Sequence, residues 1–139
     1  MTRVMIFEGN STFQEGLKNI FGSRFPAVKL LAVADAMGAL EKLEGFLPDL
    51  ILIDNKLSGD NAFDLTQKIK TRHPESIVIF LCSYDMPEYR EMASRHGADY
   101  FMVKDSPTAD YIAMIESILS ARGQPMKNTT EAKTDLNAQ

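Results

Sequence analysis

The chain has 139 residues, the length of one ordinary domain. Its 45% hydrophobic and 24% charged residues are typical of a globular protein and argue against a disordered or fibrous one. Lys and Arg number 15 against 19 Asp and Glu, and this net charge of -4 argues against a broad nucleic-acid-binding face. A single cysteine, Cys82, excludes an internal disulfide and a metal cage of several cysteines, so a reducing cytoplasm is the expected location. No stretch has the length and flanks of a signal peptide or a membrane span, and we expect no membrane association.

The predicted strands are five short apolar runs that recur along the chain. The central runs are apolar without alternation, which is the pattern of strands covered on both faces in a parallel sheet. In chain order the five runs are residues 4–7, 28–34, 50–53, 77–82 and 100–103.

A helix is predicted after each strand, because apolar residues recur there at helical spacing. The fourth helix, over residues 86–96, is more polar than the others. The apolar faces of the other four consist, in chain order, of Phe13, Leu17, Ile20 and Phe21; Ala36, Ala39, Leu40 and Leu43; Phe63, Leu65, Thr66 and Ile69; and Ile112, Ile115, Ile118 and Leu119.

This alternation of five strands and five helices predicts an α/β fold with right-handed crossovers. The expected strand order is 2-1-3-4-5, the flavodoxin-like form of a doubly wound five-stranded parallel sheet, with helices on both faces. Ligands of such sheets bind outside the carboxyl ends of the strands. The residues at those ends are therefore the candidates for function: Glu8, Gly9, Asp54, Cys82 and Lys104.

The composition divides the chain into one domain, residues 3–122, and a polar tail, residues 123–139. The tail contains no aromatic residue, one Leu and one Met, and many Asn, Thr and Lys. Such a segment buries too little apolar surface to offset the entropy of ordering, so we expect it to be disordered.

Asp54 closes the third apolar run and opens a polar loop over residues 55–61. We expect its carboxylate at the rim of the sheet rather than sunk in the core. A carboxylate can attack phosphorus and form an aspartyl phosphate, which makes Asp54 a candidate nucleophile. An aspartate at a strand end also commonly caps or turns the chain, and Asp54 by itself does not decide between these interpretations.

Glu8, Lys104 and Cys82 stand at the ends of neighbouring strands. Glu8 should lie beside Asp54, where Mg²⁺ would relieve the repulsion between the two carboxylates; the alternative is a solvated strand-end charge. The long side chain of Lys104 would reach Asp54 or a phosphoryl oxygen; the alternative is a solvated loop lysine. Cys82 is expected to be a small buried hydrophobic residue, since no histidine near it in the sequence would activate its thiol.

Three segments of this sequence resemble the receiver domain of bacterial two-component response regulators. Residues 3–17 are similar to the family's opening, in which an acidic pair follows the first strand. Residues 48–54 resemble the phosphoacceptor strand, and residues 96–106 resemble the family's Gly-Ala-Asp-Gly-Tyr run into an invariant lysine. The resemblance covers residues 3–122, and the joint match is specific although each segment alone is weak.

The resemblance implies a role for each site residue. Asp54 would accept a phosphoryl group from a histidine kinase or a phosphotransfer protein. Mg²⁺ would be held by Glu8 through water, by Asp54 and by the backbone carbonyl of Lys56. Lys104 would contact the phosphoryl group, and Phe101 stands at the family's aromatic switch position. The chain would assist its own phosphorylation by positioning and charge neutralisation rather than act as a turnover enzyme.

The sequence also departs from the family's pattern. Gly9 replaces the second acidic residue of the opening, which should weaken Mg²⁺ binding. Cys82 replaces the Thr or Ser whose hydroxyl bonds a phosphoryl oxygen, and a thiol is only a weak donor. Ser58 and Ala62 replace the usual Pro and Gly of the loop after the phosphoacceptor strand, where Asp60 is a candidate replacement acid.

Two functional hypotheses follow from the resemblance. In the first, phosphorylation of Asp54 reorganises the surface formed by the fourth helix, the fifth strand and the fifth helix, which binds a downstream protein or a second copy of the chain. In the second, the chain is a pseudo-receiver, a phosphorylation-independent interaction or dimerisation module, which Gly9 and Cys82 favour and Asp54 and Lys104 oppose. Candidate residues for the binding surface, unless they pack inside, are Tyr84, Met86, Tyr89, Met92 and Tyr111.

A flavodoxin-type cofactor binder and a DNA-binding protein are less favoured. Residues 8–12 lack the hydroxyl-rich, glycine-bearing stretch that would cradle a flavin phosphate. No helix-turn-helix module fits after residue 122, so we expect no nucleic-acid contact through this chain.

Overall fold

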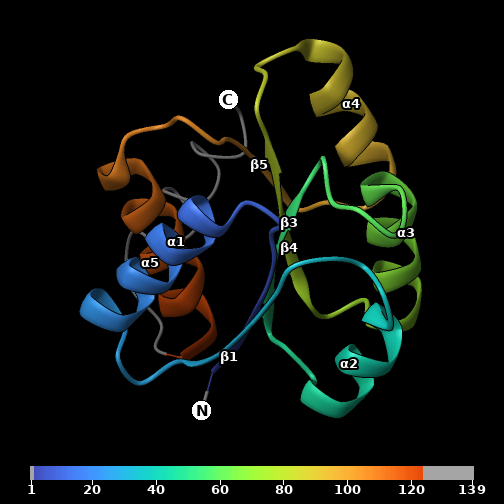
Figure 1. The fold of residues 1–139 in the computed structure, drawn as a ribbon. Helices are drawn as coiled ribbons and strands as arrows, with labels where there is room; N and C mark the ends of the chain where they lie inside the picture. The colour runs from blue at the N-terminus through green and yellow to red at the C-terminus, as the bar shows by residue number, and fades with distance from the viewer. Residues whose placement is uncertain (1, 124–139) are drawn as a thin grey trace. The chain divides into compact units, whose positions relative to one another are not determined.

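The computed structural model describes residues 2–123, in which five strands and five helices alternate (Figure 1). The predicted disordered tail, residues 123–139, lies outside the described residues except for its first position. The elements are β1 (Arg3–Phe7), α1 (Ser11–Arg24), β2 (Lys29–Val33), α2 (Ala39–Phe46), β3 (Leu50–Asp54), α3 (Ala62–Arg72), β4 (Ile77–Cys82), α4 (Pro87–Arg95), β5 (Tyr100–Val103) and α5 (Thr108–Gly123).

The five strands form one parallel sheet in the order β2-β1-β3-β4-β5, which confirms the predicted topology. The sheet and the first four helices form one compact unit that ends at Lys104, with α1 on one face of the sheet and α2, α3 and α4 on the other (Figure 1). Residues from Asp105 onward form a second unit, which contains α5. Every residue discussed below as part of the site belongs to the first unit.

The central strand β3 shows why apolar runs without alternation predicted the sheet. All five of its residues are buried, because helices cover both faces of the sheet at this strand. Each fully buried Leu, Ile or Phe side chain contributes about 1.5–3 kcal/mol to folding. On the face covered by α2, α3 and α4, the core includes Met5, Phe7, Ile51, Ile53, Val78, Phe80, Leu43, Leu65 and Ile69.

One helix begins later than its apolar pattern predicts. Ala36 has the spacing of the apolar face, but α2 begins at Ala39. The side chain of Asp35 accepts a hydrogen bond from the Met37 N–H (2.9 Å), and Gly38 adopts a left-handed conformation (φ 65°). This turn holds the chain out of the helix until Gly38, so Ala36 is buried in a loop.

Among residues 2–123, no helix combines the length and the apolar character that crossing a bilayer requires.

Candidate functional site

The register of the sheet brings three ionisable residues to the same edge. Phe7 of β1 pairs with Ile53 of β3, so the next residues, Glu8 and Asp54, lie at the same level. The backbone N–H of Lys104, directly after β5, donates to the carbonyl oxygen of Cys82 at the end of β4 (2.8 Å). All of these positions are carboxyl ends of parallel strands, where ligands of this sheet type bind.

The Lys104 ammonium lies between the two carboxylates. Its Nζ is 2.9 Å from Glu8 Oε1 and 3.2 Å from Asp54 Oδ1. Both carboxylates are buried, with 1% of Glu8 and 4% of Asp54 exposed. The structure thus brings the three residues together at the rim of the sheet, but Asp54 is buried there, so the expectation that its carboxylate is not sunk in the core is wrong. The ladder of β3 and β4 continues through Asp54, which pairs with Leu81, so Asp54 is the last residue of the strand rather than the first of the loop.

The pocket carries more negative than positive charge. Burial raises the pKa of the Glu8 carboxyl above its ordinary value, and the neighbouring Asp54 carboxylate raises it further. The Lys104 ammonium and the Asn10 N–H, which donates to Glu8 Oε2 (3.0 Å), act in the opposite direction without cancelling the shift. One ammonium therefore leaves this pair of carboxylates favourable to a further cation or a proton.

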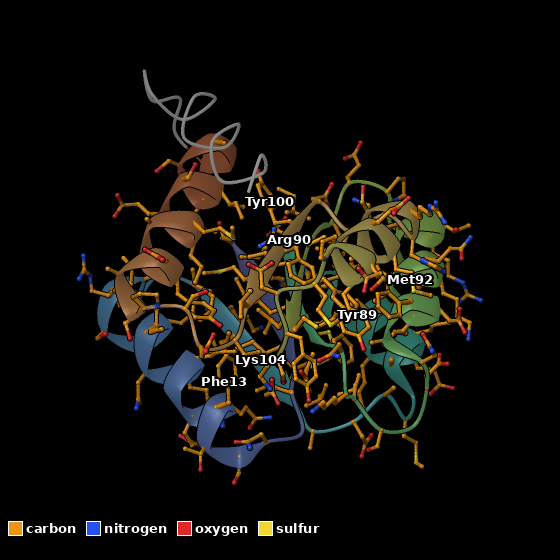
Figure 2. The ribbon with its side chains drawn as sticks, turned by 90° about the horizontal axis from the view of Figure 1, so that it is seen from above. Phe13, Tyr89, Arg90, Met92, Tyr100 and Lys104 are labelled. Atoms are coloured by element: carbon orange, nitrogen blue, oxygen red, sulfur yellow. The ribbon has the colours of Figure 1, made fainter. Side chains whose placement is uncertain are left out.

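An aromatic ring completes the surroundings of the ammonium. Lys104 Nζ lies 4.5 Å from the centroid of the Phe13 ring, and Figure 2 shows the two side chains next to each other. Sequence reasoning missed this contact, because it assigned Phe13 to the apolar face of the first helix. The available signal was that Phe13 lies in the first turn of α1, close to Glu8 in the chain.

The predicted donor set for Mg²⁺ consists of two carboxylates and a backbone carbonyl. Glu8 and Asp54 meet the one or two carboxylates that Mg²⁺ commonly uses, and the carbonyl of Lys56 follows in the next loop. Across residues 2–123, no three His, Cys, Asp or Glu side chains gather as a metal cluster. Gly9 adds no ligand, and a Cβ built there would lie 3.0 Å from the carbonyl oxygen of Ala34. The two carboxylates fit the oxygen ligands that Mg²⁺ prefers, and they are also the groups that Lys104 contacts.

The loop after β3 does not bring a replacement acid to the pocket. Asp60 accepts a hydrogen bond from the Asn61 N–H through Oδ1 (2.8 Å) and pairs with Lys68 through Oδ2 (3.1 Å). The departures at Ser58 and Ala62 have local roles instead. The Ser58 carbonyl accepts the Ala36 N–H (2.8 Å), and Ala62 is buried as the first residue of α3.

The side chain of Cys82 is completely buried, as its sequence context predicted. Phe101, which the resemblance places at a switch position, is half-buried. Its ring stacks on that of Phe80, with 6.3 Å between the two ring centroids. The guanidinium of Arg90 lies 4.7 Å from the centroid of the Phe101 ring, and Arg90 Nε pairs with Asp85 Oδ1 at 2.7 Å. Sequence reasoning missed the contact of Arg90 with Phe101, because the pattern of a polar helix does not indicate which of its basic side chains packs against the neighbouring strand.

The candidate binding-surface residues divide by exposure. Tyr84, Met86 and Met92 are exposed, and Tyr89 is half-buried with its ring 6.3 Å from that of Tyr84. Tyr111 is buried, so for this candidate the alternative that it packs inside holds. Tyrosine rings are commonly buried, and the sequence alone does not indicate how exposed a tyrosine on an apolar helix is.

The chain is similar in sequence to two bacterial proteins. A protein-glutamate methylesterase/protein-glutamine glutaminase 2 of Paramagnetospirillum magneticum is 39% identical over 105 residues, which are 76% of this chain and 30% of that protein. The regulatory protein LuxO of Vibrio vulnificus is 26% identical over 107 residues, which are 77% of this chain and 23% of LuxO. The chain thus spans less than a third of the length of these two relatives.

The fold matches solved receiver domains. The signal receiver domain of a DNA binding response regulator protein (merR) from Colwellia psychrerythraea superimposes with a TM-score of 0.81 and 19% identity, covering 86% of this chain and 99% of that one. The family model described as the response regulator receiver domain matches residues 4–116, which include all three charged residues of the pocket. With strand order, pocket position and family match in agreement, this chain belongs to the response regulator receiver domain family of two-component systems.

Proposed function

We propose that this receiver domain accepts a phosphoryl group on Asp54 from a histidine kinase or a phosphotransfer protein. The observation that carries the proposal is the placement of Lys104, whose ammonium lies 3.2 Å from the Asp54 carboxylate at the carboxyl edge of the sheet. A carboxylate next to a fixed cation is both a nucleophile and a site that tolerates the charge of an incoming phosphoryl group.

The transfer needs one bond to form and one to break. A carboxylate oxygen of Asp54 bonds to phosphorus, the bond from phosphorus to the donor's histidine nitrogen breaks, and the imidazole leaves with the electron pair. The Lys104 ammonium stabilises the negative charge on the phosphoryl oxygens as this happens. Mg²⁺, when held by Glu8, Asp54 and the Lys56 carbonyl, supplies further charge neutralisation.

Phosphorylation signals through the surface that α4 and β5 contribute. Lys104 directly follows β5, and Phe101 of β5 lies under Arg90 of α4. A new charge on Asp54 competes for Lys104 and so acts on the end of β5, which is a local charge event that biases a two-state element. The exposed Tyr84, Met86 and Met92 are the side chains through which a downstream protein or a second copy of the chain binds.

The departures at Gly9 and Cys82 lower the expected efficiency. Hydrogen bonds to charged groups are worth about 1.5–3 kcal/mol, so a thiol in place of a hydroxyl reduces the bias toward the active state about tenfold or more. These same departures support the second candidate function, a pseudo-receiver that binds its partner without phosphorylation.

The mass of the intact protein separates the two functions. The protein is incubated with acetyl phosphate and Mg²⁺ and then weighed, and we expect one added phosphoryl group. The matched control, Asp54→Asn, keeps the shape of the side chain and removes the nucleophile, so its mass should not change. An unchanged mass of the natural chain, with a donor that phosphorylates a known receiver domain in parallel, supports the pseudo-receiver.

A further inference from the structure

We propose that Phe13 is a positioning residue whose ring holds the Lys104 ammonium between Glu8 and Asp54. The inference rests on the proposed function of Asp54 as phosphoacceptor. It concerns the contact of Phe13, in α1, with Lys104, which directly follows β5. Phe13 is not one of the charged residues that define the pocket.

The first step of the argument is the freedom of the lysine. The backbone of Lys104 is fixed by its hydrogen bond to the Cys82 carbonyl (2.8 Å), but a four-carbon stem with rotatable bonds separates the backbone from the ammonium. The ammonium is located by groups on three sides: Glu8 at 2.9 Å, Asp54 at 3.2 Å, and the Phe13 ring at 4.5 Å from its centroid. A cation within about 6 Å of an aromatic centroid is attracted by the ring's quadrupole.

The second step is that the ring itself is held in place. Asn10 caps α1, and its Oδ1 accepts the Phe13 N–H at 2.9 Å. The N–H of Asn10 donates in turn to Glu8 Oε2 at 3.0 Å. The turn that orients the Glu8 carboxylate therefore also sets the position of Phe13, and both side chains contact Lys104 from the same segment of chain.

The third step is the consequence for phosphoryl transfer. When a phosphoryl group reaches Asp54, Lys104 must contact its oxygens from a defined direction, and each alternative rotamer of the stem removes that contact. The ring limits these rotamers and excludes water from one side of the ammonium, which strengthens the attraction between its charge and the phosphoryl oxygens. Without the ring, the ammonium gains freedom and hydration, and the transfer to Asp54 becomes slower.

The test uses two variants without the ring, Phe13→Leu and Phe13→Met, and one with it, Phe13→Tyr. The matched control is Phe25→Leu, which makes the same change at another half-buried phenylalanine at the end of α1. Urea unfolding shows which variants fold. If either Phe13→Leu or Phe13→Met does not fold, the other one serves as the ringless variant.

The kinetic measurement is the rate of Asp54 phosphorylation over a range of acetyl phosphate concentrations, followed by intact mass. We expect the rate at saturating donor to fall about fivefold without the ring, which corresponds to about 1 kcal/mol. Phe13→Tyr and the Phe25→Leu control should keep the natural rate. A natural rate in the folded ringless variants overturns the proposal.

A spectroscopic measurement does not depend on phosphorylation. The NMR signals of the Lys104 side chain, assigned by their loss in Lys104→Gln, should show the upfield ring-current shift of protons over an aromatic face. The shift should disappear in the ringless variants and persist in Phe13→Tyr. If the natural chain takes up no phosphoryl group, the proposed function fails, while an unshifted Lys104 signal in the natural chain overturns the positioning by Phe13.

Discussion

At the scale of single residues, the pocket combines two buried carboxylates with one ammonium. Removing two carboxylates from water is costly, and Lys104 offsets this cost through contacts of 2.9 and 3.2 Å. The raised pKa of Glu8 indicates that the compensation is incomplete. A pocket in this state favours a proton, a metal ion or a redistribution of charge when a phosphoryl group arrives.

The first residue-scale prediction concerns the pH dependence of folding. The pKa of the Glu8 carboxyl is raised above its ordinary value of 4.5 in the folded protein. Between pH 4.5 and this raised pKa, the folded state therefore binds more protons than the unfolded state. The contribution of Glu8 to the free energy of unfolding is therefore largest below pH 4.5 and falls as the pH rises through the raised pKa. Glu8→Gln removes this titration.

Urea unfolding of both proteins at a series of pH values, with EDTA to remove divalent ions, measures the effect. We expect the natural chain to lose stability relative to Glu8→Gln as the pH rises above 4.5. A difference between the two proteins that does not change with pH would contradict the raised pKa.

The second residue-scale prediction concerns Gly9. A Cβ at this position lies 3.0 Å from the Ala34 carbonyl oxygen, so Gly9→Ala forces a small backbone shift and should lower the free energy of unfolding by about 1 kcal/mol. Gly9→Asp adds a carboxylate to the same steric change. Calorimetry should then show Mg²⁺ binding about tenfold tighter to Gly9→Asp than to Gly9→Ala, a difference of about 1.4 kcal/mol.

The control for the steric effect is Gly22→Ala within α1, where an added Cβ meets no atom within 4 Å. That change should stabilise the helix. Equal Mg²⁺ affinity of Gly9→Asp and Gly9→Ala would mean that the loop directs position 9 away from the carboxylates.

At the scale of elements, the end of α2 has an unfavourable backbone. Leu47 caps this helix in the left-handed region (φ 52°, ψ 63°), where a residue with a Cβ costs about 1–2 kcal/mol. Its side chain is 59% exposed and so gains little from packing. Leu47→Gly should raise the free energy of unfolding by about 0.5–1 kcal/mol, measured by urea unfolding.

The control is Leu47→Ala, which removes most of the side chain and keeps the unfavourable backbone. We expect it to be neutral or slightly destabilising. A Leu47→Gly protein no more stable than Leu47→Ala would show that the left-handed cap is not a source of strain.

Few side chains attach α4 to the rest of the molecule. Met86 provides no side-chain cap at its start, and Ala93 is its buried residue. Arg90 supplies the contact with β5 through the Phe101 ring and is held by Asp85. An element attached by few contacts has a low cost of local opening, which suits a surface that responds to phosphorylation.

At the scale of the whole molecule, the sequence predicts the fold better than it predicts the site. The parallel sheet follows from the apolar runs, since a run such as residues 50–53 is uniformly apolar only where both faces are covered, and the strand order follows from the doubly wound fold that five strands alternating with helices predict. The meeting of Glu8, Asp54 and Lys104 also follows, because parallel strands deliver their carboxyl ends to one edge.

The sequence does not indicate in which direction a side chain points or how deeply it is buried. The sequence places Asp54 at a strand end but does not show that its carboxylate is buried there. The contact of Phe13 with Lys104 and that of Arg90 with Phe101 depend on rotamers, and helical spacing assigns a residue to a face without fixing its rotamer. Tyr111 illustrates the same limit, because an aromatic residue is compatible with an interface and with a core.

The contact between Lys56 and Tyr84 has a practical consequence. The Lys56 ammonium lies 5.1 Å from the centroid of the Tyr84 ring, and Lys56 is only two positions beyond Asp54. The chain contains no tryptophan and four tyrosines, so its ultraviolet emission comes from tyrosine alone. A displacement of the loop after β3 changes the surroundings of the Tyr84 chromophore, and the unlabelled protein therefore carries an optical probe in contact with this loop.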